Sequence, residues 1–261
     1  MKLATFLPPA SATSVAGEIR DGQAVAFTDG STVLDRLASG DRSPATGAAH
    51  PLADVTLLAP VARPGALYGI GLNYVAHAAE TQKELPESPI VFMMPPTAVT
   101  GPAGPVVCPA VVRRLDYEGE LAIVMGPGGE IAGYAVADDV SARDLQRREP
   151  QWTRAKGSDT FCPYGPWITT ADEIDDPERL RLRTWVNGEL RQDATTADLI
   201  FGPRTLVDFL GEAITLQPGD LILTGTPEGV GAAMDPRRFL ASGDVIRIEI
   251  EGLGWIEHPV A

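Results

Sequence analysis

Short apolar runs bounded by glycine or proline recur along most of the chain. Such runs are typical of β-strands, whereas amphipathic helices space their apolar residues three and four positions apart. The runs predict strands over residues 15–20, 23–27, 55–59, 90–94, 121–125, 133–137, 180–186, 221–224 and 245–250. Helical spacing covers residues 32–37, 73–83, 141–149 and 205–212, with Ser141 placed to cap the third helix. This pattern, without regular βαβ alternation, favours a strand-rich mixed α/β fold, a curled sheet assembly rather than a doubly wound sheet.

The first 52 residues have the pattern of a small β-rich unit. The dipeptide Asp21-Gly22 separates two predicted strands and accepts the positive φ of a hairpin turn. Residues 38–49 are rich in glycine, serine, alanine and proline without periodicity, which is typical of a linker. We therefore predict a small N-terminal domain over residues 1–52 and a larger domain over residues 53–261.

Composition narrows the class of protein. The chain carries 21 basic against 35 acidic residues, a net charge of −14, so nucleic acid and anionic membrane surfaces are not expected partners. Two cysteines, Cys108 and Cys162, cannot build a disulfide framework or a cysteine-rich zinc site. The first residues resemble a signal peptide, but their apolar core is shorter than the roughly 7–15 residues required. No run approaches the ~18 apolar residues of a membrane span, and we expect a cytoplasmic protein.

Several common catalytic motifs are missing. Gly69-Ile-Gly71 begins like a dinucleotide-binding fingerprint, but Tyr74 occupies the place of the third glycine. The sequence has no phosphate-binding loop, no Gly-x-Ser-x-Gly and no His-Glu-x-x-His. Of its three histidines, His50 and His258 lie near predicted surface segments. The chemistry must therefore depend largely on carboxylates.

Two pairs of acidic residues suggest a metal site. Glu118 and Glu120 are two positions apart next to a predicted strand, so their side chains project from one face with Cα atoms about 7 Å apart. A second pair, Asp138-Asp139, ends the predicted strand 133–137. Carboxylate oxygens together suit Mg²⁺, Mn²⁺ or Ca²⁺. The structural alternatives are a solvated strand face for the glutamates and a helix cap for one of the aspartates.

Two further groups are candidates for catalysis. His77 and Glu80 are three positions apart on a predicted helix, where the carboxylate can orient the imidazole as a general base for water. Lys156 follows Trp152 in a predicted loop, where its ammonium group could stabilise an enolate or a carboxylate. The structural alternatives are a surface ion pair for His77 and Glu80 and a solvated side chain for Lys156.

Five motifs, in order, resemble those of the fumarylacetoacetate hydrolase family. They are Asp116-Tyr-Glu-Gly-Glu-Leu, Asp139-Val-Ser-Ala-Arg-Asp-Leu-Gln, Gln151-Trp-Thr-Arg-Ala-Lys, Phe161-Cys-Pro-Tyr-Gly-Pro and Leu223-Thr-Gly-Thr-Pro-Glu-Gly-Val-Gly. The similarity runs from about residue 68 to about residue 244. It implies the family's C-terminal-type domain, a β-sandwich roll, with the small N-terminal β-rich domain attached, and it implies a homodimer.

The resemblance also assigns roles to individual residues. It implies three ligands for Mg²⁺, or for Mn²⁺ or Ca²⁺ in its place: Glu118, Glu120 and Asp139. It implies a catalytic dyad on a mobile lid helix and a substrate-contacting lysine: His77, Glu80 and Lys156. It implies two further polar residues near the substrate: Gln146 and Thr226. Asp138 is not expected to bind the metal.

The activity implied by the resemblance is metal-dependent hydrolysis of a C–C bond in a 2,4-dioxo acid of the acylpyruvate or fumarylpyruvate type. A β-keto acid decarboxylase of the oxaloacetate type and a 2-hydroxyhepta-2,4-diene-1,7-dioate isomerase are alternatives, because both also pass through a metal-held enolate. A non-catalytic metal-stabilised protein is less favoured, since the dyad and Lys156 are retained. A small anionic keto acid would be the partner, and Arg147 or Arg154 is expected to offset the negative charge of the chain near it.

Overall fold

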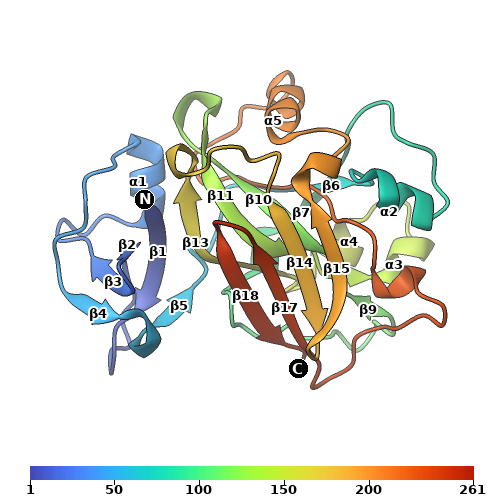
Figure 1. Ribbon diagram of the computed structural model, residues 1–261, viewed down its shortest axis with the longest axis horizontal. Coiled ribbons are helices and arrows are strands. Elements are labelled where there is room, and N and C mark those ends of the chain that lie inside the picture. The colour runs from blue at the N-terminus through green and yellow to red at the C-terminus, as the bar shows by residue number, and fades with distance from the viewer.

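The structure of the protein, a computed structural model, describes residues 1–261, and it is built largely of strands (Figure 1). Its five α-helices are short: α1 (Val33–Ser39), α2 (Val75–Glu80), α3 (Arg143–Arg148), α4 (Thr153–Lys156) and α5 (Pro203–Gly211). There are also six short 3₁₀ helices: η1 (Leu52–Asp54), η2 (Pro96–Ala98), η3 (Pro127–Gly129), η4 (Ala171–Glu173), η5 (Thr196–Asp198) and η6 (Gly231–Ala233). None of the helices has the length and apolar character that crossing a membrane requires.

A mixed twelve-stranded sheet forms the main layer. Its hydrogen-bonded path is β4 (Ala49–Pro51), β3 (Gln23–Ala26), β2 (Val15–Arg20), β1 (Lys2–Leu7), β13 (Cys162–Thr170), β11 (Ile131–Asp138), β10 (Gly119–Met125), β16 (Leu221–Leu223), β6 (Leu67–Gly71) and β7 (Ile90–Met94). Two short strands pair off this path: β5 (Thr56–Leu58) with β1, and β8 (Val99–Thr100) with β13. The central strands β10 and β11 are buried on both faces, which explains why β10 is apolar almost throughout.

A four-stranded antiparallel sheet packs on one face of the main sheet. Its order is β15 (Glu189–Thr195), β14 (Arg181–Val186), β17 (Val245–Ile250) and β18 (Gly254–Pro259). Leu121 and Ile123 of β10 share one apolar core with Leu182 of β14 and Ile248 of β17. The two layers therefore form a β-sandwich. A separate two-stranded sheet pairs β9 (Leu115–Asp116) with β12 (Ser141–Ala142).

The predicted strands are all present, with ends shifted by two residues at most. The hairpin of β2 and β3 turns at Asp21 and Gly22, whose φ angles are 50° and 72°. Nine strands were not predicted: β1, β6, β13, β15 and β18, and the shorter β4, β8, β9 and β12. Within the predicted linker, α1 extends to Ser39 and β4 begins at Ala49. Strand β1 pairs with β13, so the N-terminal strands continue the main sheet (Figure 1). The division at residue 52 stays a prediction.

Three local predictions were wrong. Ser141 does not cap a helix, because it lies in β12 opposite Asp116 and its hydroxyl donates to the Asp139 carbonyl at 3.3 Å; α3 begins only at Arg143. Helix α2 spans Val75–Glu80 and is shorter than the predicted 73–83. His258 does not lie near the surface, because its side chain points from the edge strand β18 towards Asp138 of the main sheet and is fully buried.

Candidate active site

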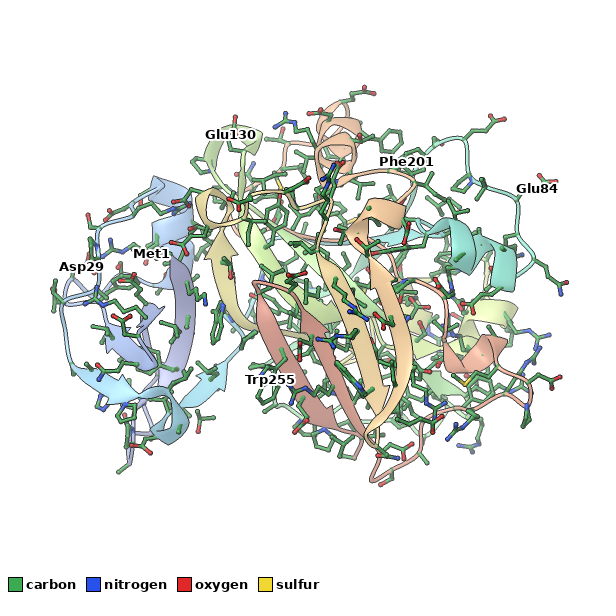
Figure 2. All side chains as sticks on the ribbon, viewed as in Figure 1. Met1, Asp29, Glu84, Glu130, Phe201 and Trp255 are labelled. Carbon is green, nitrogen blue, oxygen red and sulfur yellow. The ribbon has the colours of Figure 1, made fainter.

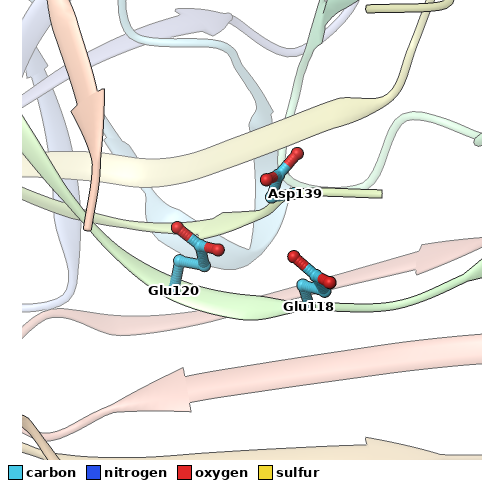
Figure 3. Close-up of side chains that lie close together, drawn as sticks. All are labelled: Glu118, Glu120 and Asp139. Carbon is cyan, nitrogen blue, oxygen red and sulfur yellow. The ribbon is translucent and has the colours of Figure 1, made fainter. Parts of the chain in front are cut away.

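The three predicted metal ligands meet where β10 begins and β11 ends. These strands are antiparallel and pair Gly119 with Asp138, so Glu118 and Asp139 lie side by side, and the Asp139 amide donates to the Glu118 carbonyl at 2.9 Å. Glu120 follows two positions along β10 on the same face. One carboxylate oxygen from each of the three residues lies within 4.8 Å of the others, and all three side chains are buried (Figure 3). We call these three residues the carboxylate cluster.

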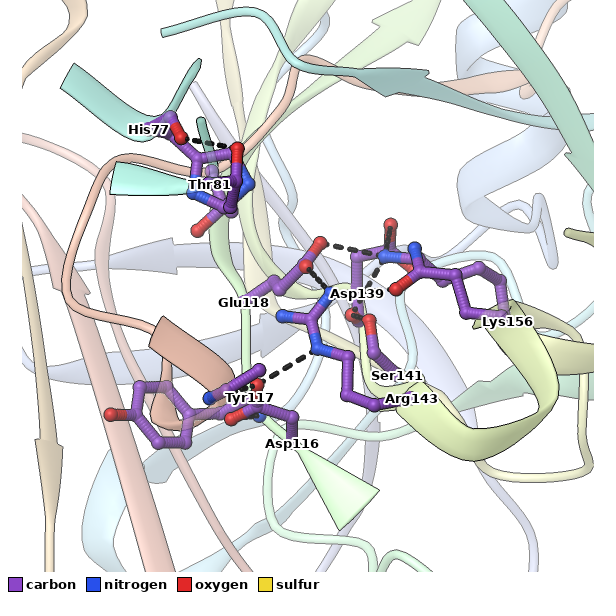
Figure 4. A network of polar contacts seen from close by, with 12 residues as sticks. His77, Thr81, Asp116, Tyr117, Glu118, Asp139, Ser141, Arg143 and Lys156 are labelled. Carbon is purple, nitrogen blue, oxygen red and sulfur yellow. Dashed lines mark hydrogen bonds and ion pairs between the residues drawn. The ribbon is translucent and has the colours of Figure 1, made fainter. Parts of the chain in front are cut away.

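Lys156 supplies a positive charge to the carboxylate cluster. Its Nζ lies 2.6 Å from Glu118 Oε2 and 2.6 Å from Asp139 Oδ2, and the side chain is only 2% exposed (Figure 4). Burial lowers the pKa of Lys156, but the carboxylates of Asp139 and Glu118 outweigh burial and raise it. The predicted loop around this lysine is instead helix α4, whose amide at Lys156 donates to the Trp152 carbonyl at 2.9 Å.

Arg143 is a second buried cation at the site, and its role was not predicted from the sequence. Its Nε donates to Asp116 Oδ2 at 2.8 Å, and its Nη1 lies 2.6 Å from Glu118 Oε1 (Figure 4). Asp116 in turn accepts hydrogen bonds from the amides of Gly231 and Ala232. Both partners lie within quoted motifs, but no local pattern shows that residues 27 positions apart form a buried ion pair.

The charges within the carboxylate cluster shift its pKa values in opposite directions. Burial raises the pKa of Glu118, but Arg143 and Lys156 outweigh it and lower the value to about 2. Burial raises the pKa of Asp139 to about 7, with Lys156 opposing and Glu118 reinforcing the rise. Burial and the charges of Asp139 and Glu118 raise the pKa of Glu120 well above its usual range. The cluster therefore still lacks positive charge, despite its two basic neighbours.

This deficit fits a divalent cation. Oδ1 of Asp139 is buried and has no hydrogen-bond partner, which is unfavourable for a carboxylate oxygen unless a cation binds it. The Glu120 carboxylate accepts one hydrogen bond, from the Gly225 amide at 2.7 Å. The donor set contains only carboxylate oxygens, which suits a hard cation such as Mg²⁺, Mn²⁺ or Ca²⁺.

The predicted dyad is formed within helix α2. Nδ1 of His77 lies 2.7 Å from Glu80 Oε1, and Glu80 Oε2 accepts a hydrogen bond from the Gly229 amide at 3.0 Å. The glutamate is thus fixed at both oxygens, and it fixes one nitrogen of the imidazole. Nε2 of His77 makes no hydrogen bond within the chain, so it is free to act on a substrate or on water.

One cavity of about 400 Å³ joins these groups. It is lined by most of the predicted site residues: His77, Glu118, Asp139, Gln146, Lys156 and Thr226. Arg143 and Arg147 also line it, whereas Arg154 does not and pairs with Glu149 at 2.7 Å. Of the two arginines considered for charge compensation, only Arg147 therefore faces the cavity.

The two predicted substrate contacts already have partners inside the protein. Oγ1 of Thr226 donates to the Gly119 carbonyl at 3.0 Å and accepts from Gln192 Nε2 at 2.8 Å. Gln146 Oε1 accepts a hydrogen bond from Arg143 at 3.0 Å, which leaves its amide NH₂ for the cavity.

Asp138 stabilises the backbone next to the carboxylate cluster. Its Oδ1 accepts a hydrogen bond from the Glu118 amide at 2.8 Å, and its Oδ2 lies 3.1 Å from Nε2 of His258. Both side chains are fully buried. Asp138 thus holds the backbone at Glu118.

A family model described as the C-terminal part of fumarylacetoacetate (FAA) hydrolase matches residues 66–261. The chain belongs to the fumarylacetoacetate hydrolase family. The predicted family is therefore confirmed, and the strand-rich prediction is confirmed by solved structures of the same fold.

Relatives in this family carry different names. The chain is 42% identical over 219 residues to a mitochondrial oxaloacetate tautomerase of Xenopus laevis, covering 79% of this chain and 69% of that protein. A crystal structure named as a 5-carboxymethyl-2-hydroxymuconate delta-isomerase from Mycobacterium smegmatis is 39% identical, with a TM-score of 0.82, and the match covers 100% of this chain and 99% of that one. A maleylpyruvate hydrolase structure from Sphingobium is 32% identical, with a TM-score of 0.80 and the same coverage. Similarity alone thus allows more than one reaction in this family.

Proposed function

We propose that the protein is a divalent-metal-dependent hydrolase that cleaves a C–C bond in small 2,4-dioxo acids of the acylpyruvate type. The observation that carries this proposal is the ordered His77–Glu80 pair on the same cavity as the carboxylate cluster. Hydrolysis needs a base for water, and an imidazole oriented through Nδ1 by a carboxylate is suited to that task.

The metal would be held by Glu118, Glu120 and Asp139. When bound, it would polarise the oxygens of a chelating 2-oxo acid and stabilise the negative charge of an enolate.

The chain's own side chains account for the proton transfers. Nε2 of His77 takes a proton from a water molecule, and Glu80 stabilises the resulting imidazolium. The water oxygen adds to the carbonyl carbon distal to the carboxylate. The C–C bond then breaks, and its electron pair leaves with the pyruvate enolate. The His77 imidazolium returns its proton to the enolate carbon, so acylpyruvate and water yield a carboxylic acid and pyruvate, and the imidazole is regenerated.

Two cations are placed to stabilise the enolate. The ammonium group of Lys156 and the guanidinium group of Arg143 both line the cavity and both contact Glu118. In a buried site such fixed charges act on developing negative charge without reorganisation of solvent.

Tautomerisation or decarboxylation of oxaloacetate is the second candidate. It is supported by the name of the Xenopus laevis relative. In tautomerisation, His77 would remove a proton from carbon rather than from water. In decarboxylation, the C–C bond to the leaving CO₂ would break to form the enolate, and protonated His77 would supply a proton to its carbon. Lys156 would face the enolate oxygen in both reactions. Isomerisation of a hydroxymuconate, after the name of the Mycobacterium smegmatis structure, needs the same proton transfer at carbon.

The test is a Mg²⁺ titration with a panel of acylpyruvates and oxaloacetate, in which pyruvate, CO₂ and the enol absorbance are measured. We expect Mg²⁺-dependent pyruvate release from acylpyruvates. His77→Ala should lower kcat by about 100-fold or more and leave Mg²⁺ affinity, measured by calorimetry, nearly unchanged. His50→Ala, which removes a histidine from β4 outside the cavity, is the control. Turnover of oxaloacetate alone would favour the second candidate, and full hydrolysis by His77→Ala would exclude the mechanism.

A further inference from the structure

Two polar side chains point inward from the four-stranded sheet. Along β18, exposed and buried residues alternate, so that Trp255 lies on the outer face (Figure 2) and His258 on the inner face. On β15, Gln192 is only 1% exposed, whereas the residue that follows it is exposed. Both inward side chains face the apolar core between the two sheets, which contains Leu182 and Ile248. Because a buried amide or imidazole is unfavourable in such a core unless it is hydrogen-bonded, the partners of these side chains indicate their role.

The Gln192 amide holds both backbone polar groups of Gly119, the residue between two of the metal ligands. Its Oε1 accepts a hydrogen bond from the Gly119 amide at 3.0 Å, and its Nε2 donates to Thr226 Oγ1 at 2.8 Å. Thr226 in turn donates to the Gly119 carbonyl at 3.0 Å. Nε2 also donates to the Pro227 carbonyl at 2.9 Å, so the position of Gln192 is itself fixed.

Strand pairing does not hold β10 on this side at Gly119. The neighbouring strand β16 pairs with β10 only over residues 122–124, so side chains take the place of a strand there. A side chain at Gly119 would prevent this contact, because a Cβ atom would overlap Oγ1 of Thr184 and approach Oε1 of Gln192 to 3.2 Å. The glycine therefore lets the two sheets approach each other closely beside the metal ligands.

His258 acts on the adjacent residue, Glu118, through Asp138. Its Nε2 lies 3.1 Å from Asp138 Oδ2, and Asp138 Oδ1 accepts a hydrogen bond from the Glu118 amide at 2.8 Å. Nδ1 of His258 is buried without a partner, so the proton of the neutral ring belongs on Nε2, which faces Asp138. The two inward side chains of the second sheet thus converge on two consecutive residues of the metal-binding strand.

We propose that Gln192 and His258 are positioning residues for the metal site: they fix the backbone from Glu118 to Gly119 and thereby the spacing of the Glu118 and Glu120 carboxylates. This inference rests on the metal-binding part of the proposed function and goes beyond it, because it assigns a role to the four-stranded sheet. The direction of a side chain on a strand follows from the backbone. A backbone free to rotate at Gly119 would therefore let the two carboxylates move independently.

Two cations should respond differently to such freedom. Mg²⁺ requires near-ideal octahedral geometry with oxygen ligands at about 2.0–2.1 Å, whereas Ca²⁺ accepts flexible geometry at about 2.3–2.6 Å. Loss of positioning should therefore weaken Mg²⁺ binding more than Ca²⁺ binding. Loss of a side chain that only stabilises the fold would lower the free energy of unfolding and leave the ratio of the two affinities in the folded protein unchanged.

The first experiment measures cation affinities of the folded, metal-free protein by calorimetry. Gln192→Met, which keeps the length of the side chain and removes its hydrogen bonds, should weaken Mg²⁺ about tenfold or more and Ca²⁺ about threefold or less. Thr196→Val is the matched control, because the buried hydroxyl of Thr196 bonds only Pro177 and Leu180. It should lower the midpoint of urea unfolding and leave both affinities as they are. Unchanged Mg²⁺ affinity in Gln192→Met, or equal weakening of both cations, would overturn the proposal.

The second experiment uses His258, and it tests the proposal even if Gln192→Met does not fold. A glutamine amide can place an N–H group where Nε2 of a histidine lies, so His258→Gln should keep Mg²⁺ affinity within about threefold. His258→Leu removes the donor and should lower Mg²⁺ affinity about tenfold or more. Equal Mg²⁺ affinity in these two variants would overturn the proposal.

Neither experiment requires turnover, so the inference and the proposed function can fail separately. Selective loss of Mg²⁺ affinity in Gln192→Met, in a protein that does not hydrolyse acylpyruvates, would support the inference and reject the hydrolase. Mg²⁺-dependent hydrolysis, with unchanged Mg²⁺ affinity in that variant, would support the hydrolase and reject the inference. An unaltered protein that binds no divalent cation would reject both.

Discussion

At the scale of single residues, Lys156 is the side chain on which the carboxylate cluster depends most. Its ammonium group contacts Glu118 and Asp139 at 2.6 Å each, at a site where three buried carboxylates repel each other. Arg143 contacts only Glu118 among them. Without Lys156, the charge of Asp139 would have no cationic partner within the chain.

We predict that Lys156→Met destabilises the metal-free protein by about 3 kcal/mol or more, because removing one partner of a buried ion pair leaves the other charge uncompensated. Saturating Mg²⁺ should recover part of this loss, because the bound cation supplies the missing charge. Urea unfolding with and without Mg²⁺ measures both effects. Lys2→Met, which removes a lysine without an ion pair, is the matched control. A loss below about 1 kcal/mol in the metal-free protein would contradict this account.

The residues of the site were predictable to different degrees. Glu118 and Glu120 could be placed on one face because side chains in a strand alternate. Asp139 could be placed at a strand end, but its proximity to Glu118 depends on the antiparallel pairing of β10 with β11. The burial of His258 against Asp138 could not be predicted, because it depends on the packing of β18 into the sandwich.

At the scale of elements, helix α2 depends on contacts at its two ends. It has six residues and no side-chain cap at its start, too few to be stable alone. Asn73, fully buried just before it, donates to the carbonyls of Phe201 and Thr224 and accepts from the Phe201 amide, at 2.7–2.9 Å. At the other end, Glu80 accepts from the Gly229 amide. These bonds position His77 over the cavity.

We predict that Asn73→Ala loosens helix α2 more than it affects the rest of the fold. Loss of one buried partner costs about 1–3 kcal/mol per group left without a hydrogen bond, and the helix has little stability of its own. Hydrogen exchange of residues 75–80 should therefore accelerate, and kcat should fall about tenfold or more through misplacement of His77. Asn187→Ala, in the turn between β14 and β15, is the control. Unchanged exchange in α2 would show that Asn73 does not anchor it.

The strands were easier to predict than the helices. Apolar runs such as residues 245–250 are bounded by local signals and gave nearly correct ends. Helix α4 was missed because four residues are too few to show a helical period. Strand β1 was missed because its apolar residues, followed by Pro8-Pro9, also resemble the start of a signal peptide.

At the scale of the whole molecule, long-range pairing joins the elements into one sheet. Strand β1 binds β13, with Leu3 opposite Ile168, and these two side chains belong to one apolar core. Partners so far apart in sequence cannot be identified from either segment alone. Long-range contacts also hold the carboxylate cluster, because Lys156 of α4 and the Gly225 amide both contact its side chains. Metal binding there therefore depends on segments far apart in the sequence.

The pH dependence of the stability of the fold follows from the carboxylate cluster. The pKa of Asp139 is raised to about 7 in the metal-free fold, above its ordinary value of 3.8. This carboxyl therefore stabilises the fold fully below about pH 4, and its contribution is lost as the pH rises towards 7. Glu120, whose pKa is also raised, acts in the same direction. Glu118, with its pKa lowered to about 2, contributes above about pH 4.5 and does not change between about pH 6 and about pH 8.

We predict that Mg²⁺ raises the melting temperature more at about pH 8 than at about pH 6. Binding at the lower pH must expel protons from Asp139 and Glu120, which weakens apparent affinity, whereas at the higher pH the cation also relieves the repulsion that destabilises the metal-free fold. At 100-fold excess over Kd, binding contributes about 2.7 kcal/mol, which corresponds to several degrees. Scanning calorimetry at both pH values, with NaCl at matched ionic strength as the control, measures the difference. Asp139→Asn should remove most of the difference between the two pH values, because the amide does not titrate and binds the cation less strongly. An equal Mg²⁺ effect at both pH values in the unaltered protein would contradict this prediction, because it would show that the cluster is already fully ionised without metal.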